Sequence, residues 1–251
     1  METPRTHETT ETSLAVLEAI TEIGGGTLSE LSDHTGLATS TLHTHLRTLV
    51  ETEYVVREGT EYRPGLKQFH LGERARHRDE RYALAKEAAA ELATRVEEEV
   101  NFAVEEHGRT IILFGATASS PGDGFQAGRY FHAHSSASGK AVMAEYPEER
   151  VRDIIDRWGM PALTNHTITD YDELLAELET VREQDYAVND QEELEGLRAV
   201  AIAVNDADGS VFGTLDISGP PYRLPEVEEV AAQLRPVVAD LEADLRSATS
   251  E

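Results

Sequence analysis

The chain has 251 residues, with 48 acidic and 22 basic side chains, a formal net charge of −26 and no cysteine. The lack of cysteine excludes disulfides, catalytic thiolates and thiolate metal sites, and no apolar run is long enough to span a membrane, so we expect a cytoplasmic protein. Acidic residues spread along the chain, with only three lysines, are typical of proteins soluble in concentrated salt and indicate a halophilic archaeon rather than an acidic partner-binding tail.

The N-terminal stretch is polar, and we expect residues 1–9 to form a disordered arm. Apolar residues then recur at helical spacing between Leu14 and Ile23, and three consecutive glycines at residues 24–26 end this pattern. The pattern predicts a first helix that supports the segment following it.

The segment 27–63 has the pattern of a helix, a tight turn, a second helix and a β-hairpin. Thr27 and Glu30 have the spacing of a capping box, and Gly36 can supply the left-handed residue that ends the first of these helices. Leucines at three- and four-residue spacing form the buried face of the second helix. We therefore predict a winged helix-turn-helix domain over residues 10–71, a unit that reads DNA.

The outer face of the second helix carries no negative charge. No Asp or Glu occurs from His34 to Val50, although acidic residues are frequent elsewhere. A carboxylate on this face would repel DNA phosphates, so its absence favours DNA binding over a purely structural helical hairpin. The predicted DNA-binding residues are Ser40, Thr41, His43, Thr44, Arg47 and Arg57.

After a connector at residues 66–72, alanines and leucines at helical spacing predict one long helix that extends to about residue 100. The arginines between Arg74 and Arg81 have two interpretations: contacts with DNA phosphates, or a solvated face paired with neighbouring acids. A long amphipathic helix between two domains also suits contacts in a dimer.

From Val100 the hydrophobic period changes, and strands and helices alternate. The predicted strands cover residues 101–105, 110–114, 199–204 and 211–217, and the predicted helices cover residues 139–145, 147–158, 171–184 and 225–245. Such a mixture, with at least one hairpin, predicts an α+β domain with an antiparallel sheet covered by helices.

Five motifs occur in order along the chain: LSELSDHTGLATSTLHTHLRTLVETEYV, YRPG, SASGKAVMA, DQEELEGLRAVAIAV and GTLDISGPPYR. Through them the chain resembles the IclR family of transcriptional regulators over nearly its whole length. The resemblance implies an α+β chain with an N-terminal winged helix-turn-helix, followed over residues 72–251 by a linker helix and a C-terminal GAF-like α/β effector-binding domain. It further implies a homodimer or homotetramer on a palindromic operator in double-stranded DNA, with no cofactor.

The resemblance also implies a small-molecule effector, usually an organic acid, an aromatic acid or a sugar-derived compound, and control of catabolic genes. Matching the motifs residue by residue places the effector-binding residues at Ala137, Ser138, Gly139, Asn189, Ala199, Asp216 and Ser218. The backbone N–H groups of Ala137 and Ser138, at a helix start, would hold a carboxylate or phosphate.

This chain departs from the family pattern at several of these positions. Asn189 stands where relatives often have a carboxylate, Ala199 where they often have cysteine, and Asp216 where they often have serine. An aspartate in the pocket would disfavour an anionic effector and favour hydroxyl groups, as on a sugar or a sugar lactone. Thr44 replaces a frequent arginine, which leaves fewer guanidinium groups to contact guanine.

Two other functions compete with a regulator. A hydrolase would need a nucleophile and a base, and His132, His134, Ser135 and Ser136 lie close together in a strand-like stretch. No Gly-x-Ser-x-Gly motif accompanies them, and a third metal ligand is not evident, so we predict neither a catalytic nor a metal site. The other alternative, a metabolite sensor that has lost DNA binding, conflicts with the carboxylate-free helix.

Overall fold

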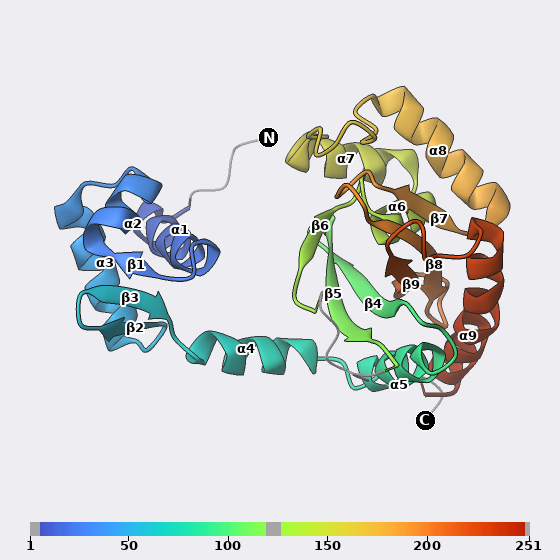
Figure 1. The fold of residues 1–251 in the computed structure, drawn as a ribbon, viewed down its shortest axis with the longest axis horizontal. Coiled ribbons are helices and arrows are strands. Elements are labelled where there is room, and N and C mark those ends of the chain that lie inside the picture. The colour runs from blue at the N-terminus through green and yellow to red at the C-terminus, as the bar shows by residue number, and fades with distance from the viewer. Residues whose placement is uncertain (1–5, 119–126, 249–251) are drawn as a thin grey trace. The chain divides into compact units, whose positions relative to one another are not determined.

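The computed structural model describes residues 6–118 and 127–248, and its chain divides into two compact units, Met1–Arg78 and Asp79–Glu251. Figure 1 shows the elements of each unit. The predicted domain boundary between residues 71 and 72 falls within helix α4, which belongs to the first unit.

The first unit combines helices with a small antiparallel sheet, ordered β1-β3-β2. Its elements are α1 (Glu8–Glu22), β1 (Gly26–Thr27), α2 (Leu28–Thr35), α3 (Thr39–Glu51), β2 (Val55–Glu58), β3 (Glu61–Pro64) and α4 (Lys67–Arg76). The predicted capping box is present, because Thr27 accepts the N–H of Glu30 while the Glu30 carboxylate accepts the N–H of Thr27. Gly36 ends α2 with φ 70°, as the turn requires.

A single apolar cluster holds this unit together. Its buried members are Val16, Ile20, Leu31, Leu42, Leu46, Leu49, Val55 and Tyr62. The three leucines of α3 all face inward, so the opposite face of α3 is left to solvent. The winged helix-turn-helix predicted from the sequence is therefore confirmed in its fold.

Two local predictions in this part of the chain were wrong. Of the predicted arm, residues 1–5 lie outside the described residues, whereas residues 8–9 already belong to α1, whose first turn is stabilised by Glu8 and Glu11. The predicted long helix is interrupted: α4 ends at Arg76 and α5 begins at Tyr82. The interruption has a side-chain cause, since the Asp79 carboxylate accepts the N–H of Arg81 at 2.9 Å and closes a turn there.

The second unit contains one six-stranded antiparallel sheet, ordered β6-β5-β4-β9-β8-β7. Its strands are β4 (Glu99–Glu106), β5 (Arg109–Ala116), β6 (Tyr130–His132), β7 (Ala187–Asp190), β8 (Arg198–Asn205) and β9 (Val211–Gly219). Its helices are α5 (Tyr82–Ala93), α6 (Ala137–Ala144), α7 (Glu148–Trp158), α8 (Tyr171–Gln184) and α9 (Val227–Ala248).

Helices cover both faces of this sheet, as Figure 1 shows. Helices α5 and α9 pack against one face, where they share an apolar core with β4, β8 and β9. Helix α6 lies on the other face, and α7 and α8 form a second apolar cluster with it. The predicted α+β architecture is confirmed, and the effector-site motifs are brought together where α6 meets β8 and β9.

The strand-like stretch around His132–Ser136 was predicted incorrectly. Strand β6 ends at His132, and the Ser136 hydroxyl instead caps α6 by accepting the N–H of Gly139 at 3.1 Å. Within residues 6–118 and 127–248, no helix is long and apolar enough to cross a membrane.

Candidate functional site

The outer face of α3 is a polar, solvent-exposed surface. Ser40, Thr41, His43, Thr44 and Arg47 are all exposed, as the sequence predicted. The Arg47 guanidinium lies 3.8 Å from Glu51, and both side chains are 71% exposed, so this ion pair is weak and can be exchanged for a phosphate. The Thr44 hydroxyl donates to the Ser40 carbonyl at 3.1 Å, so its hydrogen is already used within the helix.

The wing formed by β2 and β3 has little net charge. Arg57 is exposed and donates to the Gly59 carbonyl at 3.1 Å. The second wing arginine, Arg63, forms ion pairs with Glu58 at 3.2 Å and Glu61 at 2.8 Å. A wing that carries its own carboxylates gains less from DNA phosphates than a basic wing would.

In the second unit, a small cavity lies between α6 and the sheet. Its lining residues are Ala103, Ile112, Phe131, Ser136, Ala137, Ser138, Asn189, Leu197, Ala199, Asp216 and Ser218. Six of the seven predicted effector-binding residues are among them. The exception is Gly139, where an added Cβ would lie 2.3 Å from the Ala133 carbonyl oxygen, so this glycine serves close packing of α6.

The cavity has a volume of about 30 Å³, which is room for one or two water molecules. Small-molecule sites usually measure about 300 Å³ or more. Any effector larger than a few atoms therefore has to displace part of the cavity wall, to which α6, β8 and β9 contribute.

Among the described residues that line the cavity, Asp216 carries the single carboxyl group. Asp216 is 4% exposed, and its two oxygens accept hydrogen bonds from Asn101 Nδ2 at 3.0 Å and Ser138 Oγ at 3.1 Å. Burial raises the pKa of Asp216 to about 7, although both hydrogen bonds act in the opposite direction. Near neutral pH the carboxyl is thus divided between its neutral and charged forms.

Asn101 is a functional residue that the sequence analysis missed. It is fully buried on β4 and also donates to the Ser218 hydroxyl at 3.1 Å, so it positions two cavity residues. Among the described residues its Oδ1 atom has no hydrogen-bond partner. A polar residue within an apolar strand was the available signal.

A backbone hydrogen bond orients the Asn189 side chain. Its Oδ1 atom accepts the backbone N–H of Glu192 at 2.8 Å, which leaves the NH₂ group for the cavity that the side chain lines. Glu192 is in turn bound to the buried Lys140, at 2.6 Å, and Lys140 also binds Glu177 at 2.9 Å. Lys140 does not line the cavity, and no basic side chain does so among the described residues.

At the start of α6 the Gly139 N–H is bound by the Ser136 hydroxyl. That the N–H groups of Ala137 and Ser138 hold an anion stays a prediction. The stretch from His132 to Ser136 shows no pairing of a serine nucleophile with a histidine base. His134 Nε2 lies 3.2 Å from the Pro161 carbonyl, and burial lowers the pKa of His134. The hydroxyl of Ser135 binds Glu193 and that of Ser136 binds the His132 carbonyl. Across residues 6–118 and 127–248 no group of three or more side chains is placed to hold a metal ion.

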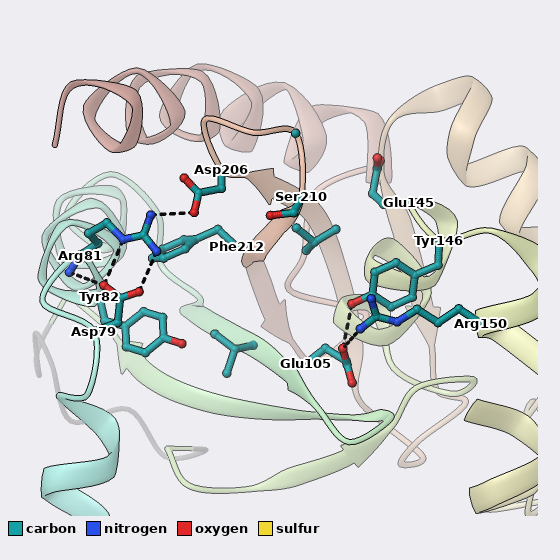
Figure 2. A pocket seen from close by; sticks show the side chains of 13 residues that line it. Asp79, Arg81, Tyr82, Glu105, Glu145, Tyr146, Arg150, Asp206, Ser210 and Phe212 are labelled. Atoms are coloured by element: carbon teal, nitrogen blue, oxygen red, sulfur yellow. Dashed lines mark hydrogen bonds and ion pairs between the residues drawn. The ribbon is translucent and has the colours of Figure 1, made fainter. Parts of the chain in front are cut away.

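A second, larger cavity of about 460 Å³ lies at one end of the sheet (Figure 2). On one side of it, Arg81 lies between Asp79 and Asp206, and on the other, Arg150 and the Tyr146 hydroxyl both bind Glu105. Because these charged groups already bind one another, this cavity is a poor candidate for the effector site.

Comparison with known proteins agrees with this geometry. Residues 10–59 match the IclR helix-turn-helix domain, and residues 76–243 match the C-terminal domain of bacterial IclR transcriptional regulators. The chain belongs to the IclR family. The predicted absence of enzymatic activity is confirmed by this membership, since the family consists of transcriptional regulators.

Individual IclR-family proteins resemble the chain over nearly its whole length. A probable regulator, ArcR, from the archaeon Halobacterium salinarum is 29% identical over 98% of this chain and 96% of its own. This relative agrees with the halophilic, archaeal character indicated by the composition. An IclR regulator structure from Alicyclobacillus acidocaldarius has a TM-score of 0.78 at 24% identity, covering 95% of this chain and 99% of its own.

A second IclR-family structure contains a ligand. It is a homologue from Microbacterium hydrocarbonoxydans in complex with 4-hydroxybenzoate, with a TM-score of 0.74 at 21% identity over 94% of this chain and 99% of its own. At this level of identity the likeness shows the shared fold alone.

Proposed function

We propose that this IclR-family regulator binds a palindromic operator as a homodimer or homotetramer, and that an uncharged, hydroxyl-bearing effector in the α6 cavity changes its affinity for DNA. The DNA-binding residues proposed are Ser40, Thr41, His43, Thr44, Arg47 and Arg57. The effector-binding residues proposed are Ala137, Ser138, Asn189, Ala199, Asp216 and Ser218, and the genes controlled are catabolic.

The observation that carries the effector class is the cavity wall itself. It combines a buried carboxyl, Asp216, with serine hydroxyls and the Asn189 amide, and none of the described lining residues is basic. An anion bound beside Asp216 would require that carboxyl to be protonated, so its affinity would fall as the pH rises through 7. A hydroxyl group instead donates to the carboxylate without any charge conflict. The homologue that binds 4-hydroxybenzoate supports a small-molecule site in this fold, although that ligand is an acid.

DNA binding is tested by recovering genomic fragments with the purified protein in molar KCl and sequencing them. We expect a few fragments that share a palindrome, and the neighbouring genes then identify the pathway. Uniform recovery, or the same fragments with Arg47→Ala, would favour the alternative of a metabolite sensor without DNA binding.

The effector class is tested by calorimetric titration of polyols against the aldonates of equal chain length. We expect the polyol of each pair to bind more tightly, because Asp216 repels the carboxylate, and we expect Asp216→Asn to remove that preference. Tight aldonate binding that is independent of both pH and residue 216 would contradict the proposal.

A further inference from the structure

Arg81 connects the beginning of the second unit to the strands that line the effector cavity. We propose that Arg81 is the positioning residue that transmits cavity occupancy to the chain leading to the DNA-binding unit. This inference rests on the proposed function, because it concerns regulation through the same cavity.

The Arg81 side chain is held from two directions, as Figure 2 shows. Its Nε and Nη2 atoms donate to the two carboxylate oxygens of Asp79 at 3.1 and 2.8 Å, and its Nη1 atom donates to Asp206 at 2.6 Å. The guanidinium also lies 5.0 Å from the ring centroid of Phe212. The two carboxylates raise the pKa of Arg81, so the group stays charged at any pH at which the protein is folded.

Asp206 and Phe212 belong to the hairpin of β8 and β9. The turn is closed by a hydrogen bond from the Asp206 N–H to the Ser210 carbonyl at 2.7 Å, and Phe212 packs against the Tyr82 ring of α5 at 5.3 Å. The same two strands carry Ala199, Asp216 and Ser218 in the cavity wall. Because the cavity is too small for an effector as it stands, we expect binding to displace its wall, which includes β8 and β9.

The other partner, Asp79, is the first residue of the second unit. Only two residues separate it from Arg76, the last residue of α4. A shift of the hairpin that moves Asp206 therefore moves Arg81, Asp79 and the start of α5 with it, and the covalent link to the first unit is short. A purely structural ion pair would stabilise α5 without carrying any response to the cavity.

The chain contains no cysteine, which allows the cavity to be filled without knowing the effector. In Ala199→Cys the only thiol lies in the cavity wall. Its thiolate attacks methyl methanethiosulfonate, which transfers a methylthio group as a mixed disulfide and releases methanesulfinate, and the added methylthio group serves as the occupant. The variant is combined with Arg81→Met, with the milder Asp206→Asn, or with Arg152→Met as a control. Arg152 is an exposed arginine paired with Glu148 at 2.9 Å on α7.

Two responses to this methylthiolation are measured in molar KCl: hydrogen exchange of the amides of residues 82–86, and affinity for a fragment recovered from genomic DNA. With Arg81 intact, and in the Arg152→Met control, we expect exchange to change and affinity to shift about fivefold or more. In Arg81→Met and Asp206→Asn we expect both responses to shrink to less than about twofold, a range below ordinary allosteric coupling.

An exchange response of equal size with and without Arg81, or no exchange response in any variant, would overturn the inference. An exchange response that needs Arg81 but leaves DNA affinity unchanged would support the role of Arg81 and contradict the proposed function. Mass spectrometry of the modified thiol and the melting temperature of each variant confirm that the proteins compared are folded and fully labelled.

Discussion

The α3 surface and the α6 cavity both carry polar side chains, but those on α3 are exposed and those at the cavity are buried. On α3, serine, threonine, histidine and arginine are exposed and bind water when no DNA is present. In the cavity, Asp216, Asn101 and Asn189 are buried, and protein groups orient each of them. Exposed polar groups contribute little to folding and remain free to bind a partner, whereas buried ones have to be satisfied by the fold itself.

This contrast predicts that substitutions of buried polar residues in the second unit affect folding, while those on α3 affect only DNA binding. The largest expected effect is at Lys140, which is 1% exposed and bound to two glutamates. Lys140→Met leaves Glu192 buried without a counter-charge and should lower the free energy of unfolding by about 3–5 kcal/mol. Lys86→Met, at an exposed lysine, is the matched control and should stay within about 0.5 kcal/mol. Denaturant titration of both variants at one KCl concentration measures the difference.

The second expected effect is a dependence of folding stability on pH, caused by Asp216. The folded protein holds the pKa of Asp216 at about 7, whereas the unfolded chain has the ordinary value of about 3.9, so between these values the folded state binds the extra proton. The contribution of this group to stability is therefore greatest below pH 4 and is lost as the pH rises towards 7, by up to about 1.4 kcal/mol per pH unit.

Comparison with Asp216→Asn across this range isolates the effect, because all other titrating groups are shared. The difference in unfolding free energy between the two proteins should change steadily from pH 4 to 7 in favour of the variant. A constant difference would show that Asp216 is charged throughout and that the cavity is better hydrated than the structure indicates.

On the α3 surface we expect a substitution to change DNA affinity and to leave folding stability nearly unchanged. Arg47→Ala should weaken operator binding by about 1–3 kcal/mol, since a guanidinium contact with a base or phosphate is lost. Its unfolding free energy should change by less than about 0.5 kcal/mol, because the side chain is 71% exposed. Fluorescence anisotropy with labelled operator and thermal melting of the same samples test both statements. A large loss of stability in Arg47→Ala would contradict the view that the polar side chains of α3 contribute little to folding.

The smallest expected effect is a change in DNA affinity after substitutions in the wing. Glu58→Gln with Glu61→Gln removes the carboxylates that pair with Arg63 and should raise DNA affinity by about twofold to fivefold at low salt. In molar KCl the gain should disappear, because the Debye length falls to about 3 Å or less. A gain that persisted there would indicate a direct contact between the wing and the bases.

The sequence by itself determined several elements whose signal is local. The capping box at Thr27, the left-handed turn at Gly36 and the inward leucines of α3 depend on neighbours within a few residues, and the structure contains all three. The resemblance to the IclR family also located six of the cavity residues, because its motifs survive at their own positions along the chain.

Only the tertiary structure decided what depends on residues far apart. At the break between α4 and α5, the Arg81 side chain binds Asp206, which is 125 residues away, and helical periodicity is insensitive to this contact. Asn101 and Asp216 are 115 residues apart and meet only because β4 pairs with β9. The raised pKa of Asp216 and the buried Lys140–Glu192 pair arise from the same cause: burial is a property of the folded sheet and its helices, and the chemistry of these side chains changes only once water is excluded.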